Sequence, residues 1–212
     1  MDAGAPKFRR RKADRPAEIV SAAMAVFAEK GFAAAKLDEI ARREGISKGA
    51  VYLYFETKAD IFRAAVGQVI APNITALKAM AAAHPGPLVD LLRGVVAHAR
   101  GVVETTPVGG VLKMVVAEAG NFPEIARVWH DQLVAQALGV VTAAIEAAQA
   151  RGEVKPGNAR IYALELIAPM VVSVIWRETF VPAGAEPFDI PTVMTQHVEI
   201  LLHGMLSEGA RA

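Results

Sequence analysis

The segment between residues 47 and 58 gathers side chains that suit contact with a nucleic acid. Lys48 and Lys58 carry positive charge, and Tyr52 and Tyr54 carry hydroxyl groups that can donate to phosphate oxygens or to bases. Phosphate contacts position a protein on a duplex, whereas contacts to base edges select the sequence. The predicted contact surface comprises Ser47, Lys48, Gly49, Ala50, Tyr52, Leu53, Tyr54 and Lys58.

A pair of short helices is expected to hold this surface. Residues 37–44 form the first, and Gly45 begins a tight turn because glycine readily adopts a positive φ. Ser47 then caps a second helix over residues 48–55, whose inward side chains repeat at i, i+4. Two short helices around a three-residue turn are typical of the helix-turn-helix that reads DNA. A solvated helix pair without a DNA partner is the alternative.

Helical periodicity continues along the rest of the chain, with no strand-like alternation and no internal repeat. The sequence therefore predicts an all-α fold. The expected helices span residues 14–31, 37–44, 48–55, 58–83, 88–104, a short stretch from 107, 121–152, 159–180 and 189–206.

Charge is unevenly distributed. Residues 1–66 hold thirteen Lys or Arg against nine Asp or Glu, whereas the net charge of the whole chain is only +1. A basic N-terminal third indicates a polyanionic partner for that part alone. Residues 1–13, with their basic run Arg9–Lys12, are expected to form a flexible arm that either enters a DNA minor groove or merely solubilises the chain.

The composition argues against a membrane span and against disulfides. The longest stretches without a charged side chain, Ala64–Leu77 and Gln132–Ile145, each have 14 residues, fewer than the roughly 18 that a span requires. The chain has no cysteine, which fits a reducing cytoplasm. No apolar segment follows the basic N-terminus, so a signal peptide is not expected.

Enzyme chemistry finds no support in the sequence. The five histidines lie at positions 84, 98, 130, 197 and 203, and no pair has the spacing of a helical metal site. No P-loop, dinucleotide-binding or nucleophile-elbow motif is present. We expect no catalytic residue, no metal site and no cofactor.

The N-terminal part of the sequence resembles a known protein family. The chain resembles the DNA-binding domain of TetR/AcrR-family transcriptional regulators over about 50 residues. The matching runs are Gly31-Phe32, Leu37-Asp38-Glu39-Ile40-Ala41, Gly45-Ile46-Ser47-Lys48-Gly49-Ala50-Val51-Tyr52-Leu53-Tyr54-Phe55 and Lys58-Ala59-Asp60-Ile61-Phe62.

The resemblance implies a homodimer that binds a pseudo-palindromic DNA operator and releases it when a small lipophilic effector binds. It implies a basic arm over 1–13, a DNA-binding domain over 14–62 and an effector-binding and dimerisation domain over 63–212. The expected protein is a cytoplasmic regulator, most simply a repressor. The alternatives are a ligand-binding module with a vestigial DNA head or, with less support, an enzyme on a helical scaffold.

One position departs from the family pattern. Members often have Thr or Ser at the start of the first helix of the pair, whereas this chain has Ala35 and Lys36. Losing the capping hydroxyl costs about 1 kcal/mol in comparable helices. The hypothesis is that Lys36 replaces the lost phosphate contact by its charge.

Two further sets of residues are predicted for the C-terminal part. Apolar stripes on the helices 159–180 and 189–206 favour pairing across a two-fold axis, with an intradomain core as the alternative. The predicted interface comprises Ile161, Leu164, Ala168, Val172, Ile175, Met194, Val198, Leu201 and Met205. The predicted effector pocket, which rests on the resemblance, comprises His98, Met114, Phe122, Trp129, Met170 and Trp176.

Overall fold

The computed structural model describes residues 15–208, and every regular element in that range is a helix apart from one isolated β-bridge. The all-α prediction is therefore confirmed. The chain divides into two compact units, Met1–Ala65 and Val66–Ala212. The basic arm predicted over residues 1–13 lies outside the described residues.

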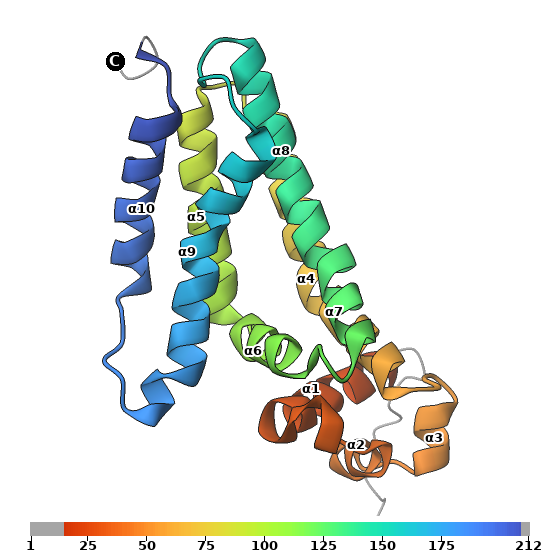
Figure 1. Ribbon diagram of the computed structural model, residues 1–212. Helices are drawn as coiled ribbons and strands as arrows, with labels where there is room; N and C mark the ends of the chain where they lie inside the picture. The colour runs from red at the N-terminus through yellow and green to blue at the C-terminus, as the bar shows by residue number, and fades with distance from the viewer. Residues whose placement is uncertain (1–14, 209–212) are drawn as a thin grey trace, which may run out of the picture. The chain divides into compact units, whose positions relative to one another are not determined.

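The first unit contains α1 (Arg15–Ala34), α2 (Leu37–Glu44), α3 (Lys48–Tyr52) and the beginning of α4 (Lys58–Ala83) (Figure 1). Gly31 interrupts α1 with a φ of 77°, so the regular helix ends there as the sequence predicts. The rings of Phe27, Phe32 and Phe62 pack at centroid distances of 5.4 to 6.3 Å. This aromatic cluster holds α1 against the start of α4.

Helix α3, the second helix of the predicted helix-turn-helix, is shorter than expected. It ends at Tyr52 instead of Phe55, and the amides of Tyr54 and Phe55 both donate to the carbonyl of Val51 at 3.0 Å. Gly45 has a φ of 74° and closes α2, which confirms the predicted turn. Val51 and Phe55 are buried as predicted, so the register of the segment is the expected one.

The second unit is a layered helical bundle in which α9 packs against both α8 and α10 (Figure 1). The predicted helix over 121–152 is present but contains a five-residue π-helical segment, His130–Val134. Beyond α4, the helices are α5 (Leu88–Thr105), α6 (Val108–Glu118), α7 (Pro123–Trp129), α8 (Ala135–Ala150), α9 (Ala159–Thr179) and α10 (Ile190–Met205).

Short backbone contacts close one end of this bundle. The amide of Lys155 donates to the carbonyl of Met205 at 2.9 Å, and the amide of Ser207 donates to the carbonyl of Glu153 at 2.9 Å. A carboxylate oxygen of Glu153 also accepts from the amide of Leu88 at 3.0 Å. One loop residue thus satisfies an otherwise unpaired amide at the beginning of α5.

Within the described range, two helical stretches, 123–150 and 159–183, are long and apolar enough to cross a membrane by length and composition. The sequence prediction measured only charge-free stretches, of which Gln132–Ile145 lies inside the first of these two. Membrane insertion has weak support here, since apolar helices that pack within a bundle pass the same test. In this structure the two stretches pack against each other through α8 and α9.

Candidate nucleic-acid interface and apolar cavity

One side of α3 is anchored and the other is open to solvent. The hydroxyl of Ser47 accepts from the amide of Ala50 at 3.2 Å and caps the helix, as predicted. Val51 is fully buried, whereas Tyr52 is 49% and Leu53 79% exposed. An exposed leucine beside an exposed tyrosine, on a helix fixed from behind, gives a surface suited to contact with base edges and sugars.

Lys48 lies on the same surface but already has a partner. Its ammonium nitrogen is 2.7 Å from a carboxylate oxygen of Asp38 in α2, and both side chains are more than half exposed. The hydrogen bond to Asp38 raises the pKa of Lys48 above its usual value. Lys48 therefore stays charged at neutral pH and can exchange this carboxylate for a phosphate.

Lys58 has a structural contact in place of the exposed position expected for it. Its ammonium donates to the carbonyl oxygens of Phe32 at 2.7 Å and Ala33 at 3.0 Å, and lies 4.9 Å from the centre of the Phe32 ring. Cations favour such carbonyls at the end of a helix. Its predicted DNA contact is thus not favoured in this conformation.

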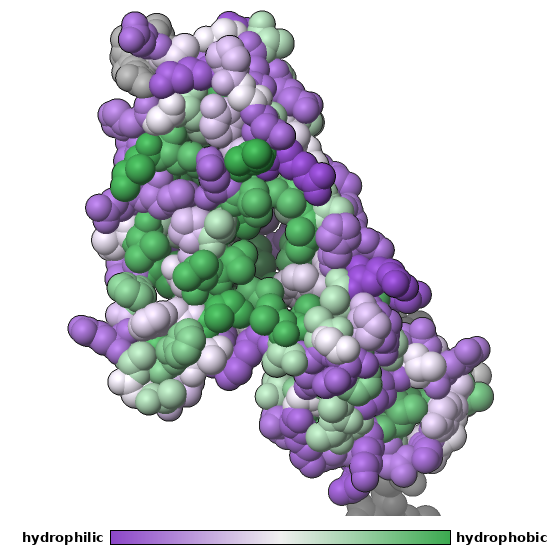
Figure 2. Space-filling view, viewed as in Figure 1, coloured by the Kyte–Doolittle hydropathy of each residue, from purple (hydrophilic) through white to green (hydrophobic). Residues whose placement is uncertain are grey.

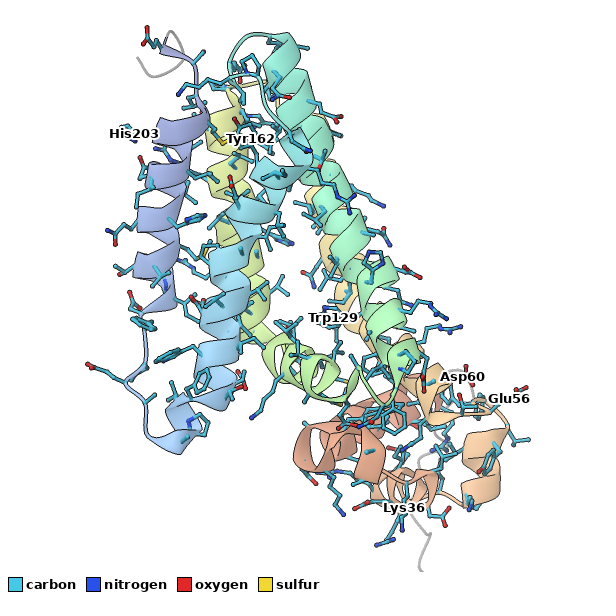
Figure 3. All side chains as sticks on the ribbon, viewed as in Figure 1. Lys36, Glu56, Asp60, Trp129, Tyr162 and His203 are labelled. Carbon is cyan, nitrogen blue, oxygen red and sulfur yellow. The ribbon has the colours of Figure 1, made fainter. Side chains whose placement is uncertain are left out.

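Lys36 occupies the predicted position at the beginning of α2. Its backbone is extended and its side chain makes no capping hydrogen bond. The side chain is exposed (Figure 3 labels it). It borders a hollow that is lined by two further basic residues, Lys30 and Arg42, and by two acidic ones, Asp38 and Glu39. Its position is compatible with a phosphate contact.

The other three predicted contacts differ in exposure. Gly49 is exposed, and a Cβ atom placed there would meet only the Ser47 hydroxyl at 3.9 Å. Ala50 and Tyr54 are half-buried. The small residues at 49 and 50 therefore leave the beginning of α3 open to close approach.

The second unit encloses an apolar cavity of about 410 Å³. Its walls come from α4, α5, α6, α9 and the continuous stretch from α7 to α8, and no charged side chain lines it within the described range. Figure 2 shows the apolar residues gathered around this hollow. Within the described range, Asn73, His98 and Trp129 are the lining residues whose side chains carry nitrogen or oxygen, yet the surface that faces the cavity is almost wholly apolar, a composition typical of a site for a lipophilic molecule.

The structure divides the predicted pocket residues into two groups. His98, Trp129 and Met170 line the cavity (Figure 3 marks Trp129). Met114, Phe122 and Trp176 do not, which corrects the sequence prediction. Bulk alone does not show which way a helical side chain points. The signal that was missed is the apolar face formed by α4, the π-helical segment and α8, including Ile70, Ile74, Leu133 and Leu138.

Trp176 is engaged elsewhere. Its indole nitrogen donates to the carbonyl of Glu186 at 2.9 Å, and its ring packs 5.1 Å from each of Phe180 and Phe188. This aromatic group fastens the loop after α9 to the helix. Trp176 is therefore a structural residue.

The predicted interface residues also separate. On α9, Ile161, Leu164 and Val172 are 52%, 54% and 64% exposed, while Ala168 and Ile175 are half-buried. Leu164, Ala168 and Val172 additionally line the cavity, a role that the sequence reading did not assign to them.

On α10 the prediction needs correction. Met194, Val198 and Met205 are at most 3% exposed, because they pack inside their own unit. Leu201 is half-buried, and Ile200, which the prediction omitted, is 64% exposed. A wide apolar stripe on a helix does not show which edge is covered by its own domain.

Comparisons with known proteins agree with this arrangement. Residues 19–65 match the family model described as bacterial regulatory proteins, tetR family, and residues 84–187 match the model described as tetracyclin repressor-like, C-terminal domain. The HTH-type transcriptional repressor BepR of Brucella suis is 40% identical over 80 residues, which are 37% of this chain and 38% of BepR. This curated relative is thus matched over about two fifths of its length.

Solved structures cover far more of the chain. A TetR-family regulator from Mesorhizobium loti has a TM-score of 0.74 and 19% identity, over 94% of this chain and 100% of that one. The complex of SmeT, from Stenotrophomonas maltophilia, with triclosan has a TM-score of 0.75 and 22% identity, over 92% and 93%. These similarities establish the fold.

The helix-turn-helix unit, the helical unit with its apolar cavity and the two family models together define the class: this is a regulator of the helix-turn-helix type. The chain belongs to the TetR family of bacterial regulatory proteins. The matched families and relatives are transcriptional regulators and not enzymes, in agreement with the sequence prediction.

Proposed function

We propose that the protein is a homodimeric, ligand-responsive transcriptional repressor that acts in the cytoplasm on a pseudo-palindromic DNA operator. The observation that carries the proposal is the two-sided α3, with Val51 and Phe55 buried and Tyr52 and Leu53 exposed. A helix anchored in this way presents a fixed set of side chains to a DNA groove. Lys36 and Lys48 supply positive charge on the same unit.

Dimerisation is supported by the exposed apolar stripe of α9. Ile161, Leu164 and Val172 recur at helical spacing and are each more than half exposed. A single reading helix contacts only a few base pairs, whereas two helices about 34–36 Å apart read a two-fold related site. Pairing through this stripe would cover its apolar surface and supply the second reading helix.

Effector control is supported by the apolar cavity. Ile70, Asn73 and Ile74 of α4 line it, and the same helix begins in the DNA-binding unit at Lys58. An effector that favours one position of α4 shifts the equilibrium by its difference in affinity for the two states, typically 1–3 kcal/mol. The related fold of SmeT holds triclosan, a precedent for a small apolar ligand in such a fold.

The test is to recover genomic fragments bound by the purified full-length protein and to map the protected site by footprinting. We expect a two-fold related site whose affinity falls steeply with salt. Genes beside the site would show whether the protein represses, by their increased transcription when it is removed. Weak, salt-dependent binding without sequence preference would show a vestigial DNA head.

A further inference from the structure

The cavity wall contains one histidine, His98, in which one ring nitrogen is buried without a hydrogen-bond partner. His98 of α5 is half-buried and lines the cavity, and its Nε2 atom is buried without a hydrogen-bond partner. A buried polar atom left unpaired lowers stability, so such an atom in a native fold calls for an explanation.

A bound water molecule is a poor explanation for the unpaired Nε2 atom of His98. A buried water needs two to four polar partners, and the other polar side chains on the cavity wall are Asn73 and Trp129 alone. One N–H of the Asn73 amide donates to the carbonyl of Val69 at 2.7 Å, and the surface that faces the cavity is almost wholly apolar. The cavity thus provides little to hold a water molecule beside His98.

We propose that His98 is the polar anchor of the effector site and selects uncharged lipophilic molecules that carry one hydroxyl group. The proposal rests on the proposed function, since it assumes that the cavity binds an effector. A neutral imidazole nitrogen either donates or accepts, and a hydroxyl complements both states. The absence of charged side chains from the described cavity wall disfavours an ionic ligand.

Because Nε2 is buried, the His98 ring must turn before this nitrogen can contact a ligand. The torsion about the Cβ–Cγ bond of histidine has broad minima, so the ring can turn its nitrogen toward a ligand without displacing α5. The neighbouring wall residues Val95, Ala99 and Val102 have short side chains.

The experiment compares two probes that differ by one hydroxyl, 4-hexylphenol and hexylbenzene. Each displaces the fluorescent apolar reporter N-phenyl-1-naphthylamine from the full-length protein. The measured quantity is the ratio of their dissociation constants in the wild type and in His98→Phe. We expect the preference for the phenol to fall about tenfold in His98→Phe, as for loss of one hydrogen bond.

Two further variants test whether a change in the ratio comes from the lost hydrogen bond or from a change in the cavity wall. His98→Gln keeps a polar group and should restore part of the preference for the phenol. Leu133→Met changes another part of the cavity wall without adding a strong hydrogen-bonding group, so both probes should respond in parallel. Thermal unfolding of every variant identifies any that fails to fold.

The outcomes separate the two proposals. If both probes bind but their ratio is the same in the wild type, His98→Phe and His98→Gln, the role of His98 is overturned while the effector cavity stands. If the reporter and both probes fail to bind the folded wild type, the effector cavity itself is overturned, and the role of His98 with it.

Discussion

The ammonium nitrogen of Lys48 in α3 lies 2.7 Å from a carboxylate oxygen of Asp38 in α2. The ion pair joins the two helices of the helix-turn-helix on their exposed side. A DNA phosphate would have to compete with Asp38 for this lysine. If Lys48 contacts phosphate, we expect the pair to lower affinity for any duplex and to leave a larger share of the binding to the exposed Tyr52 and Leu53.

Replacing Asp38 tests this competition. Asp38→Asn should strengthen binding to operator and to unrelated DNA alike, because Lys48 is freed and one negative charge is removed. Lys48→Ala should weaken both and lower the salt slope by about one. Fluorescence anisotropy with two duplexes at several salt concentrations measures these effects. Unchanged affinity in Asp38→Asn would show that Lys48 does not contact phosphate.

Lys36→Ala tests the lysine at the beginning of α2. If its charge replaces the phosphate contact of a capping hydroxyl, the salt slope should decrease by about one, with similar weakening across sequences. Lys78→Ala is the matched control, since Lys78 belongs to the other unit and donates to Gln136 at 2.9 Å. An equal slope in Lys36→Ala and the wild type would reject the role.

Val172→Asp tests the exposed stripe of α9. An acidic side chain in the middle of an apolar interface would be buried without a partner, so the dimer dissociation constant should rise at least a hundredfold. Sedimentation velocity over a concentration series measures the change. Val116→Asp on α6 is the control, because Val116 is similarly exposed at 62%. A Val172→Asp dimer as stable as the wild type would move the interface elsewhere.

Trp176→Phe leaves Trp129, which lines the cavity, as the single tryptophan, so its fluorescence reports on binding in the cavity. The chain has two tryptophans, of which Trp129 lines the cavity and Trp176 does not. Hexylbenzene should therefore change the fluorescence of Trp176→Phe, whereas Trp129→Phe should show little response. Equal responses from the two variants would mean that the probe binds outside the cavity.

The stability that Glu153 adds at the closed end of the bundle should depend on pH. The pKa of Glu153 is lowered from its ordinary value of 4.5, first by a hydrogen bond from Arg151 and also by the amide of Leu88. A lowered folded-state pKa adds stability that is complete above the unfolded value and disappears as the pH falls through the folded one. The free energies of unfolding of the wild type and of Glu153→Gln, measured with urea, should thus differ by about 0.5 kcal/mol at pH 7. The two values should converge in acid. If the two free energies of unfolding differed by the same amount in acid, the role of the Glu153 charge would be contradicted.

The sequence predicted most of the fold because each helix has its own local signals. Ser47 was predicted to cap a helix and does so. The helices expected from residues 58 and 189 begin at Lys58 and Ile190, where the side chains of Thr57 and Asp189 cap them. The π-helical segment was missed, since its apolar residues also fit a regular helix. Side-chain direction was harder, because Met114 and Met194 are packed by helices that are distant in sequence.

The same limit applied to the candidate sites. The exposed face of α3 followed from a buried pair four residues apart, a purely local pattern. The engagement of Lys58 with carbonyl oxygens of α1 could not be predicted, because it depends on a contact between residues 26 apart. Cavity walls built from several helices are likewise a tertiary property, and only three of the six predicted lining residues are found there.

The π-helical segment His130–Val134 lies between Trp129 and Leu138, two residues of one cavity wall. A π-bulge holds one residue more than the α-helix around it needs. Deleting a single residue there would shorten the chain while the flanking turns kept their orientation. The same deletion farther along α8 would rotate every later residue by about 100° and carry Ile145 out of the core. The wide turn is thus a point where the helix tolerates a change in length.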